Sequence, residues 1–168
     1  MSRTLYLVRH AESLSASGDQ KDFERTLTNN GYMNATKMGH YLFEQNVRPN
    51  KFVSSDAIRA RQTTLNMAEQ MKSDTNKIVW EHELYEASVR TFLKVVNDLQ
   101  VEWKVVVMVG HNPTISYLAE YITGEAIEDM PTSSVVQIDF DLESWAEVSE
   151  GNGNFIRQIN SDQIEQNS

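Results

Sequence analysis

VVVMVGHNP, residues 105–113, is the stretch of sequence that decides the fold. It opens with five consecutive apolar residues, which are typical of a central strand covered on both faces. Asn112 and Pro113 are then favoured as the cap and the first position of a helix that extends to about residue 123. A buried strand that leads directly into a helix predicts an α/β fold.

The rest of the chain repeats this alternation of strands and helices. Short runs of β-branched and aromatic residues predict strands, and apolar residues spaced three or four apart predict helices. The predicted strands are 4–8, 51–54, 77–80, 105–109, 134–140 and 154–159, and the predicted helices are 28–46, 55–71, 88–99 and 112–123. We therefore expect a three-layer α/β/α sandwich with a mostly parallel central sheet. The last two strands lack a full-length helix between them and predict an antiparallel edge.

The length of 168 residues suits one domain with its own core. No internal repeat or linker divides the chain, so residues 1–160 are expected to form a single domain. The polar segment from Asn160 (NSDQIEQNS) is expected to fray, which leaves 161–168 as a C-terminal tail. The expected helix caps are Thr28, Ser55 or Asp56, and Ser88.

The composition excludes several classes of protein. A hydrophobic content of 40% and a charged content of 23% are those of a folded globular protein. No apolar stretch approaches the roughly 20 residues of a membrane span, and the N-terminus reaches Arg9 too soon for a signal peptide, so we expect a cytoplasmic protein. Without cysteine there are no disulfides and no thiolate sites. The net charge of −9 argues against nucleic acid and anionic membranes as partners, and makes a local cluster of arginines more informative.

Polar side chains follow four of the predicted strands, at the point where each strand ends. In open α/β sheets, ligands bind outside the carboxyl ends of the strands, so these side chains are expected to share one edge. They are Arg9 and His10; Ser54, Ser55 and Arg59; Glu81, His82, Glu83 and Glu86; and Gly110 and His111. Two histidines, at least two arginines and several carboxylates therefore converge on one candidate site.

The residue types at this edge favour phosphoryl chemistry. Arg9, Arg59 and Arg25 could surround an anion, and the fork of a guanidinium suits phosphate oxygens. The helix that begins after His111 would add free N–H groups. A histidine between such cations has a lowered pKa, because a nearby positive charge disfavours the imidazolium. A neutral imidazole is a nucleophile, and its attack on phosphorus would form a phosphohistidine.

The leaving group of such a reaction must take a proton. Glu86 is the candidate acid, because a carboxylic acid whose pKa is raised by burial can donate a proton near neutral pH. Glu83 and Glu81 are weaker candidates, and His82 lies among these glutamates. The alternative for Glu86 is an ordinary charged residue near a helix start.

Three segments of the chain resemble the histidine phosphatase superfamily, also called the phosphoglycerate mutase-like superfamily. Residues 9–13 (RHAES) are similar to its R-H-G/A motif, with alanine in place of the commoner glycine. Residues 54–63 (SSDAIRARQT) resemble its S-S-x-x-x-R-A-x-Q-T segment, and residues 109–112 (VGHN) resemble the segment that supplies its second histidine. The three occur in family order. The short chain and residues 22–31 (DFERTLTNNG) further resemble the SixA-type phosphohistidine phosphatases.

The resemblance implies roles for the residues that match these motifs. His10 corresponds to the nucleophile, and Arg9, Arg59 and His111 complete the phosphate pocket. No metal and no other cofactor is implied, and arginines beside the histidines would repel a metal cation. Arg25 matches the arginine of the SixA-type stretch, and it could instead bind Asp22 or Glu24 on the surface.

The resemblance leaves the substrate open between two classes. A SixA-type enzyme would act on a phosphohistidine of a protein partner, such as a phosphotransfer domain in a signalling relay. A small-molecule phosphomonoesterase on the same fold would act on a phosphorylated metabolite. A third interpretation, a module that only binds phosphorylated ligands, would need the arginines and not both histidines. We expect a monomer or a weak oligomer.

Overall fold

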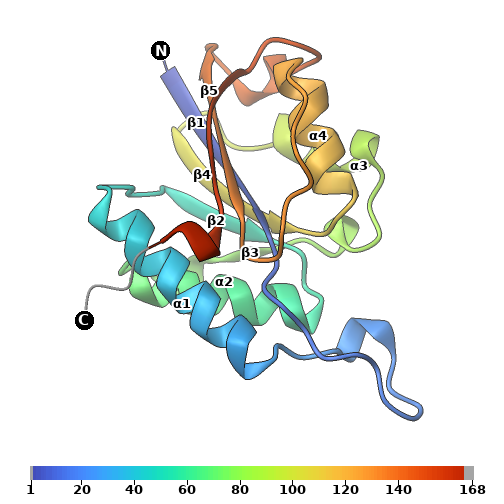
Figure 1. Ribbon diagram of the computed structural model, residues 1–168. Coiled ribbons are helices and arrows are strands. Elements are labelled where there is room, and N and C mark those ends of the chain that lie inside the picture. The colour runs from blue at the N-terminus through green and yellow to red at the C-terminus, as the bar shows by residue number, and fades with distance from the viewer. Residues whose placement is uncertain (1, 165–168) are drawn as a thin grey trace.

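A computed structural model describes residues 2–164 of the chain. One six-stranded sheet forms the middle layer, and four α-helices cover its two faces (Figure 1). The strands are β1 (Ser2–Arg9), β2 (Lys51–Ser54), β3 (Val79–Trp80), β4 (Val105–Gly110), β5 (Val135–Asp141) and β6 (Asn154–Ile159). The helices are α1 (Asn29–Glu44), α2 (Ile58–Gln70), α3 (Val89–Asn97) and α4 (Thr114–Thr123). The predicted three-layer α/β/α sandwich is confirmed.

The sheet has the strand order β3-β2-β4-β1-β5-β6. β1, β4, β2 and β3 pair in parallel, and β5 and β6 add to β1 as antiparallel strands. Both the mostly parallel sheet and its antiparallel edge are therefore as predicted. β3 is shorter than the predicted strand 77–80, because Thr75–Lys77 forms a turn of 3-10 helix.

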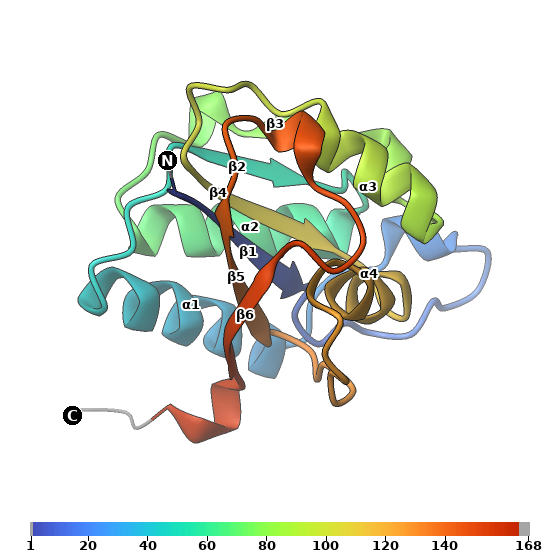
Figure 2. The ribbon, with the colours of Figure 1, turned by 90° about the horizontal axis from the view of Figure 1, so that it is seen from above.

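The sheet buries both of its faces against helices. Figures 1 and 2 show α1 and α2 on one face and α3 and α4 on the other. In β4, Val106 and Met108 belong to the core under α3 and α4, whereas Val107 and Val109 belong to the core under α1 and α2. The apolar run that begins at residue 105 therefore forms a central strand covered on both sides.

Two predicted helix caps are present and two are replaced. Thr28 accepts a hydrogen bond from the Gly31 N–H at the start of α1, and Ser88 accepts one from the Thr91 N–H at the start of α3. The predicted cap of α2 was wrong: its N-cap is Ala57, which makes no side-chain bond. Asp56 instead binds His82, and Ser55 binds His111. The predicted cap Asn112 was also wrong, because α4 begins at Thr114 after Pro113.

The start of the predicted tail is folded. Ser161–Gln163 forms a turn of 3-10 helix, closed by a capping box between Asn160 and Gln163. Ile164 packs against the core under α1 and α2. The expectation that the chain frays from Asn160 is therefore wrong up to Ile164, since the turn forms its own backbone hydrogen bonds and partly buries an apolar side chain. Residues 165–168 lie outside the described part of the chain.

Within residues 2–164, no helix is long and apolar enough to cross a membrane.

The contact between α1 and α2 predicts a glycine that cannot be replaced without cost. A Cβ on Gly39 would lie 2.9 Å from both the Cα and the carbonyl oxygen of Met67. Alanine normally stabilises a helix relative to glycine by about 1 kcal/mol, but here the obstacle is backbone and would force the helices apart. We expect Gly39→Ala to lower the free energy of unfolding in urea by roughly 1–3 kcal/mol. Met33→Ala, at an exposed position of the same helix, should change it by less than about 0.5 kcal/mol; equal stability of the two variants would contradict the proposed clash.

Candidate active site

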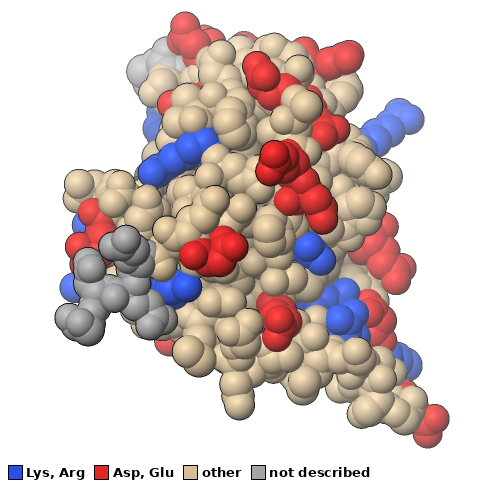
Figure 3. Space-filling view, in the orientation of Figure 1, with Lys and Arg blue, Asp and Glu red and all other residues tan. Residues whose placement is uncertain are grey.

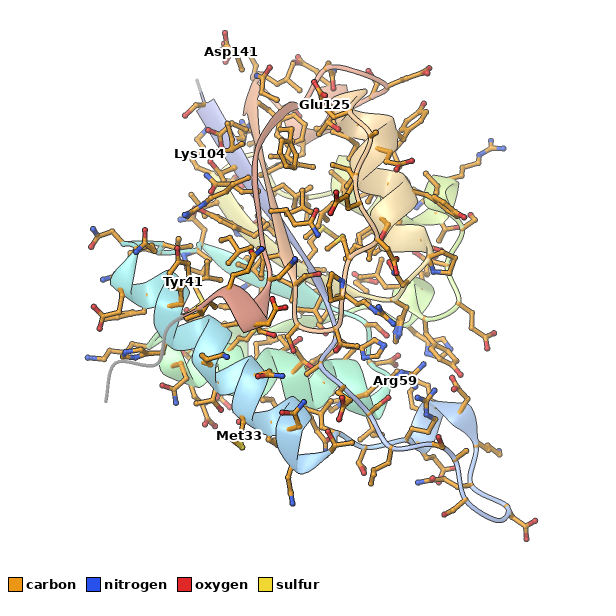
Figure 4. All side chains as sticks on the ribbon, viewed as in Figure 1. Met33, Tyr41, Arg59, Lys104, Glu125 and Asp141 are labelled. Atoms are coloured by element: carbon orange, nitrogen blue, oxygen red, sulfur yellow. The ribbon has the colours of Figure 1, made fainter. Side chains whose placement is uncertain are left out.

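The candidate residues at the ends of β1, β2 and β4 are brought to one edge of the sheet, as the sequence predicts. The His10 N–H donates to the Gly110 carbonyl, and the Ser55 N–H donates to the Val109 carbonyl, so the chains leaving the three strands stay side by side. Arg59 reaches the same edge from the first turn of α2 (Figure 4). Lys and Arg side chains gather at this part of the surface, with acidic side chains beside them (Figure 3).

His10 is buried and its ring is held in one orientation. Its Nδ1 lies 2.8 Å from the Ala11 carbonyl oxygen. A carbonyl only accepts, so Nδ1 carries the proton and Nε2 keeps its lone pair. The Ala11 peptide is itself fixed, because its N–H donates to the Thr63 hydroxyl, which donates to the Arg59 carbonyl. His10 therefore presents a basic, nucleophilic nitrogen from a rigid support.

Burial keeps His10 neutral. It is the main cause that lowers the pKa of His10 to about 4, and the charges of Arg59, Arg9 and Arg25 lower it further. The bond to Ala11 acts in the opposite direction and is outweighed. The pKa of His10 is lowered, as the sequence predicts, but burial contributes more to the lowering than the neighbouring arginines do.

His111 is the second histidine of the site. The centroids of the His10 and His111 rings are 5.1 Å apart. Nε2 of His111 lies 2.8 Å from the Ser55 hydroxyl, which is the contact that takes Ser55 away from capping α2. Burial first, and then the His10 ring, lower the pKa of His111 to about 3. Both histidines are therefore neutral at neutral pH.

Arg9 and Arg59 enter the site with part of their hydrogen-bonding capacity unused. Nη1 of Arg9 donates to the Met130 carbonyl, and both Nη atoms of Arg59 donate to Asp22. Nε of Arg9, Nε of Arg59 and Nδ1 of His111 are buried and have no partner among the described residues. Buried polar groups are nearly always paired, so three unpaired ones beside a nucleophile favour an anion as the missing partner.

Asp22 and Tyr85 complete the site, and the sequence does not predict either of them as site residues. One carboxylate oxygen of Asp22 accepts from Arg59 at 3.0 Å and from the Tyr85 hydroxyl at 2.7 Å. The other oxygen accepts from Arg25 at 2.8 Å. Arg25, Tyr85 and Arg59 hold the pKa of Asp22 well below its usual range, and burial together with Asp22 raises the pKa of Tyr85 to about 12. The spacing of Asp22 and Arg25 in the SixA-type stretch is the signal that marks this pair.

Arg25 also ties the loop before α1 to the site. Its Nε donates to the Leu14 carbonyl and its Nη2 to the Ser13 hydroxyl, in addition to the bond to Asp22. Arg25 is thus next to the pocket, and it binds Asp22 as the surface interpretation expects.

The burial expected for Glu86 is absent. Glu86 is exposed, at a backbone φ of 56°. Its neighbour Tyr85 instead points toward the pocket, where its ring lies 5.7 Å from that of His111. His82 is also exposed and binds Asp56 outside the pocket. The burial on which the argument for Glu86 as an acid depends is therefore missing, and its role stays a prediction.

Several solved structures share this fold. A candidate phosphohistidine phosphatase SixA from Agrobacterium tumefaciens is 28% identical, covers 94% of this chain and 97% of its own, and superposes with a TM-score of 0.81. The protein histidine phosphatase SixA complexed with tungstate is 22% identical, over 96% of this chain and 99% of its own, with a TM-score of 0.83. A mycobacterial glucosyl-3-phosphoglycerate phosphatase is 16% identical, over 92% and 97%, with a TM-score of 0.71.

Comparison with the curated proteins finds no match. The sequence does match branch 1 of the histidine phosphatase superfamily over residues 5–92, which is more than half of the chain. This range contains Arg9, His10 and Arg59. The fold, the motifs and the family match agree, and the chain belongs to the histidine phosphatase superfamily.

Proposed function

We propose that this protein is a metal-independent phosphatase that works through a phosphohistidine at His10. The observation that carries the proposal is the state of His10: the Ala11 carbonyl fixes the proton on Nδ1, burial keeps the ring neutral, and Nε2 remains free. Arg9, Arg59 and His111 surround this nitrogen with donors suited to a phosphoryl group.

The reaction would proceed in two displacements. Nε2 of His10 attacks phosphorus, the bond from phosphorus to the leaving group breaks, and the leaving group takes a proton. Water then attacks the phosphohistidine, the N–P bond breaks, and inorganic phosphate leaves with His10 restored. The guanidinium groups of Arg9 and Arg59 offset the charge on the phosphoryl oxygens in both steps.

The substrate that we propose is a phosphohistidine on a protein partner, such as a phosphotransfer domain. The similarity to the SixA of Agrobacterium tumefaciens over nearly the whole chain supports this class. A protonated imidazole is also a good leaving group. A phosphohistidine therefore depends less than an ester does on a general acid such as the exposed Glu86. The cytoplasm is the compartment in which we place this activity.

The lowered pKa of His10 predicts how activity depends on pH. His10 is neutral above about pH 4, and it takes up a proton and ceases to be a nucleophile as the pH falls through that value. We expect the ring nitrogens of His10, followed by NMR with 15N-labelled histidine, to titrate near pH 4 instead of near 6.5. Titration of the ring near neutral pH would show that His10 is not buried and neutral as described.

The proposed intermediate predicts covalent labelling of His10. Wild-type protein mixed with a 32P-labelled phosphohistidine protein and stopped in alkali should carry label, whereas His10→Ala should carry none because it lacks the nucleophile. His40→Ala, which removes an exposed histidine of α1, should label like the wild type. Turnover without any adduct on the wild type would overturn the double displacement, and absence of both turnover and adduct would favour a module that only binds phosphorylated ligands.

A comparison of substrates separates the two classes of phosphatase. We expect a higher kcat/KM for the phosphohistidine protein than for alkyl phosphate esters, and a loss of activity in Glu86→Gln that is confined to the esters. A general acid contributes about 10²–10⁴-fold to a reaction whose leaving group must be protonated, and an alkoxide depends on it more than an imidazole does. A clear preference for the esters would instead identify a small-molecule phosphomonoesterase.

A further inference from the structure

The charges around His10 leave a small positive surplus. Three guanidinium groups, those of Arg9, Arg25 and Arg59, lie close enough to act on His10, and the carboxylate of Asp22 offsets one of them. Because both histidines are neutral at neutral pH, the three arginines and Asp22 together carry two net positive charges, before the carboxylates farther out are counted. A phosphoryl group on a monoester or a histidine carries nearly two negative charges at this pH. The phosphoryl group therefore uses the whole surplus.

Asp22 also uses some of the donors that a second anionic group could otherwise bind. It engages both Nη atoms of Arg59, through its backbone carbonyl and its carboxylate. Each nitrogen of Arg25 is also engaged, by Asp22, by Leu14 and by Ser13. Yet the Asp22 side chain is 49% exposed, so its charge faces whatever enters the pocket.

Two further carboxylates lie close to residues of the site. The negative charge of Asp129 favours the charged form of Arg9, and Asp129 accepts a hydrogen bond from Asn112. Glu86 lies near enough to Tyr85 to raise its pKa. Acidic side chains flank the group of Lys and Arg side chains at this face (Figure 3). The part of a substrate that projects out of the pocket therefore meets negative charge.

We propose that Asp22 determines specificity by rejecting substrates that carry a second negative charge near the phosphoryl group. This inference rests on the proposed function, in that it takes the His10 pocket as the phosphoryl site. The substrate class that fits is a phosphoryl group on a neutral or cationic carrier, such as a histidine side chain with neutral or basic neighbours. Phosphorylated metabolites with a nearby carboxylate are discriminated against, because selectivity arises as much from repulsion of the wrong ligand as from attraction of the right one.

Two aryl phosphates isolate this effect, namely 4-carboxyphenyl phosphate and its neutral amide analogue, 4-carbamoylphenyl phosphate. They have the same shape, and they differ in one charge at the far side of the ring. For unit charges roughly 7 Å apart and an effective dielectric between those of a protein surface and water, Coulomb's law gives about a fivefold to tenfold preference for the amide. We expect this preference in the kcat/KM of the wild type, and we expect Asp22→Asn to reduce it to about twofold or less.

The matched control is Glu24→Gln, which removes an exposed charge two residues away that makes no contact with the pocket in the described structure. This variant should keep the preference of the wild type. Any general damage in Asp22→Asn affects both esters and cancels in the ratio. High salt screens the interaction of exposed charges, so 0.5 M NaCl should abolish most of the wild-type preference and leave the ratio of Asp22→Asn unchanged.

The same ratio can be measured without catalysis. In a His10→Ala background, the dissociation constants of the two esters by calorimetry should show the same preference, and addition of Asp22→Asn should remove it. Equal ratios with and without the Asp22 carboxylate, in binding or in kcat/KM, would overturn the inference. Failure of the proposed function would look different, because the wild type would then bind the esters selectively but neither hydrolyse them nor form an adduct.

Discussion

The parallel pairing of β1 with β4 is the constraint on which the site depends. Its register sets Arg9 opposite Gly110, so that the next residue of each strand, His10 and His111, leaves the sheet at the same level. The two rings consequently lie with their centroids 5.1 Å apart. A shift of the register by one residue would reverse which side chains face each core, and the apolar packing on both faces of these strands opposes it. The core thus fixes the distance between the two histidines.

The parts of the molecule that follow from local patterns could be predicted from the sequence. The apolar run from residue 105 predicts a central strand, and the rule that ligands bind at the carboxyl ends of parallel strands then brings His10, Arg59 and His111 together. Thr28 can cap α1 because its hydroxyl accepts from the Gly31 N–H while it donates to Glu12, so the two bonds do not compete. Where one interaction dominates, sequence is sufficient.

The parts that could not be predicted are those in which one side chain has two uses. Ser55 and Asp56 have the chemistry of helix caps, but His111 and His82, which lie 56 and 26 positions further along the chain, compete for them. The sequence predicts Asp22 only as a possible surface partner of Arg25. The contact between Asp22 and Arg59 depends on the fold. Burial likewise depends on the whole fold, which is why the cause of the pKa shift of His10 is not visible in its neighbours along the chain.

The hydroxyl of Thr63 links the position of α2 to the orientation of the His10 ring. Thr63 lies one turn after Arg59 on α2 and donates to the Arg59 carbonyl. Its hydroxyl also accepts from the N–H of Ala11, the residue whose carbonyl holds the proton of His10 in place. A displacement of α2 would therefore move the guanidinium of Arg59 and release the tautomer of His10 at the same time. The position of the Arg59 charge and the protonated nitrogen of His10 are coupled through one hydroxyl, so the two are set together or lost together.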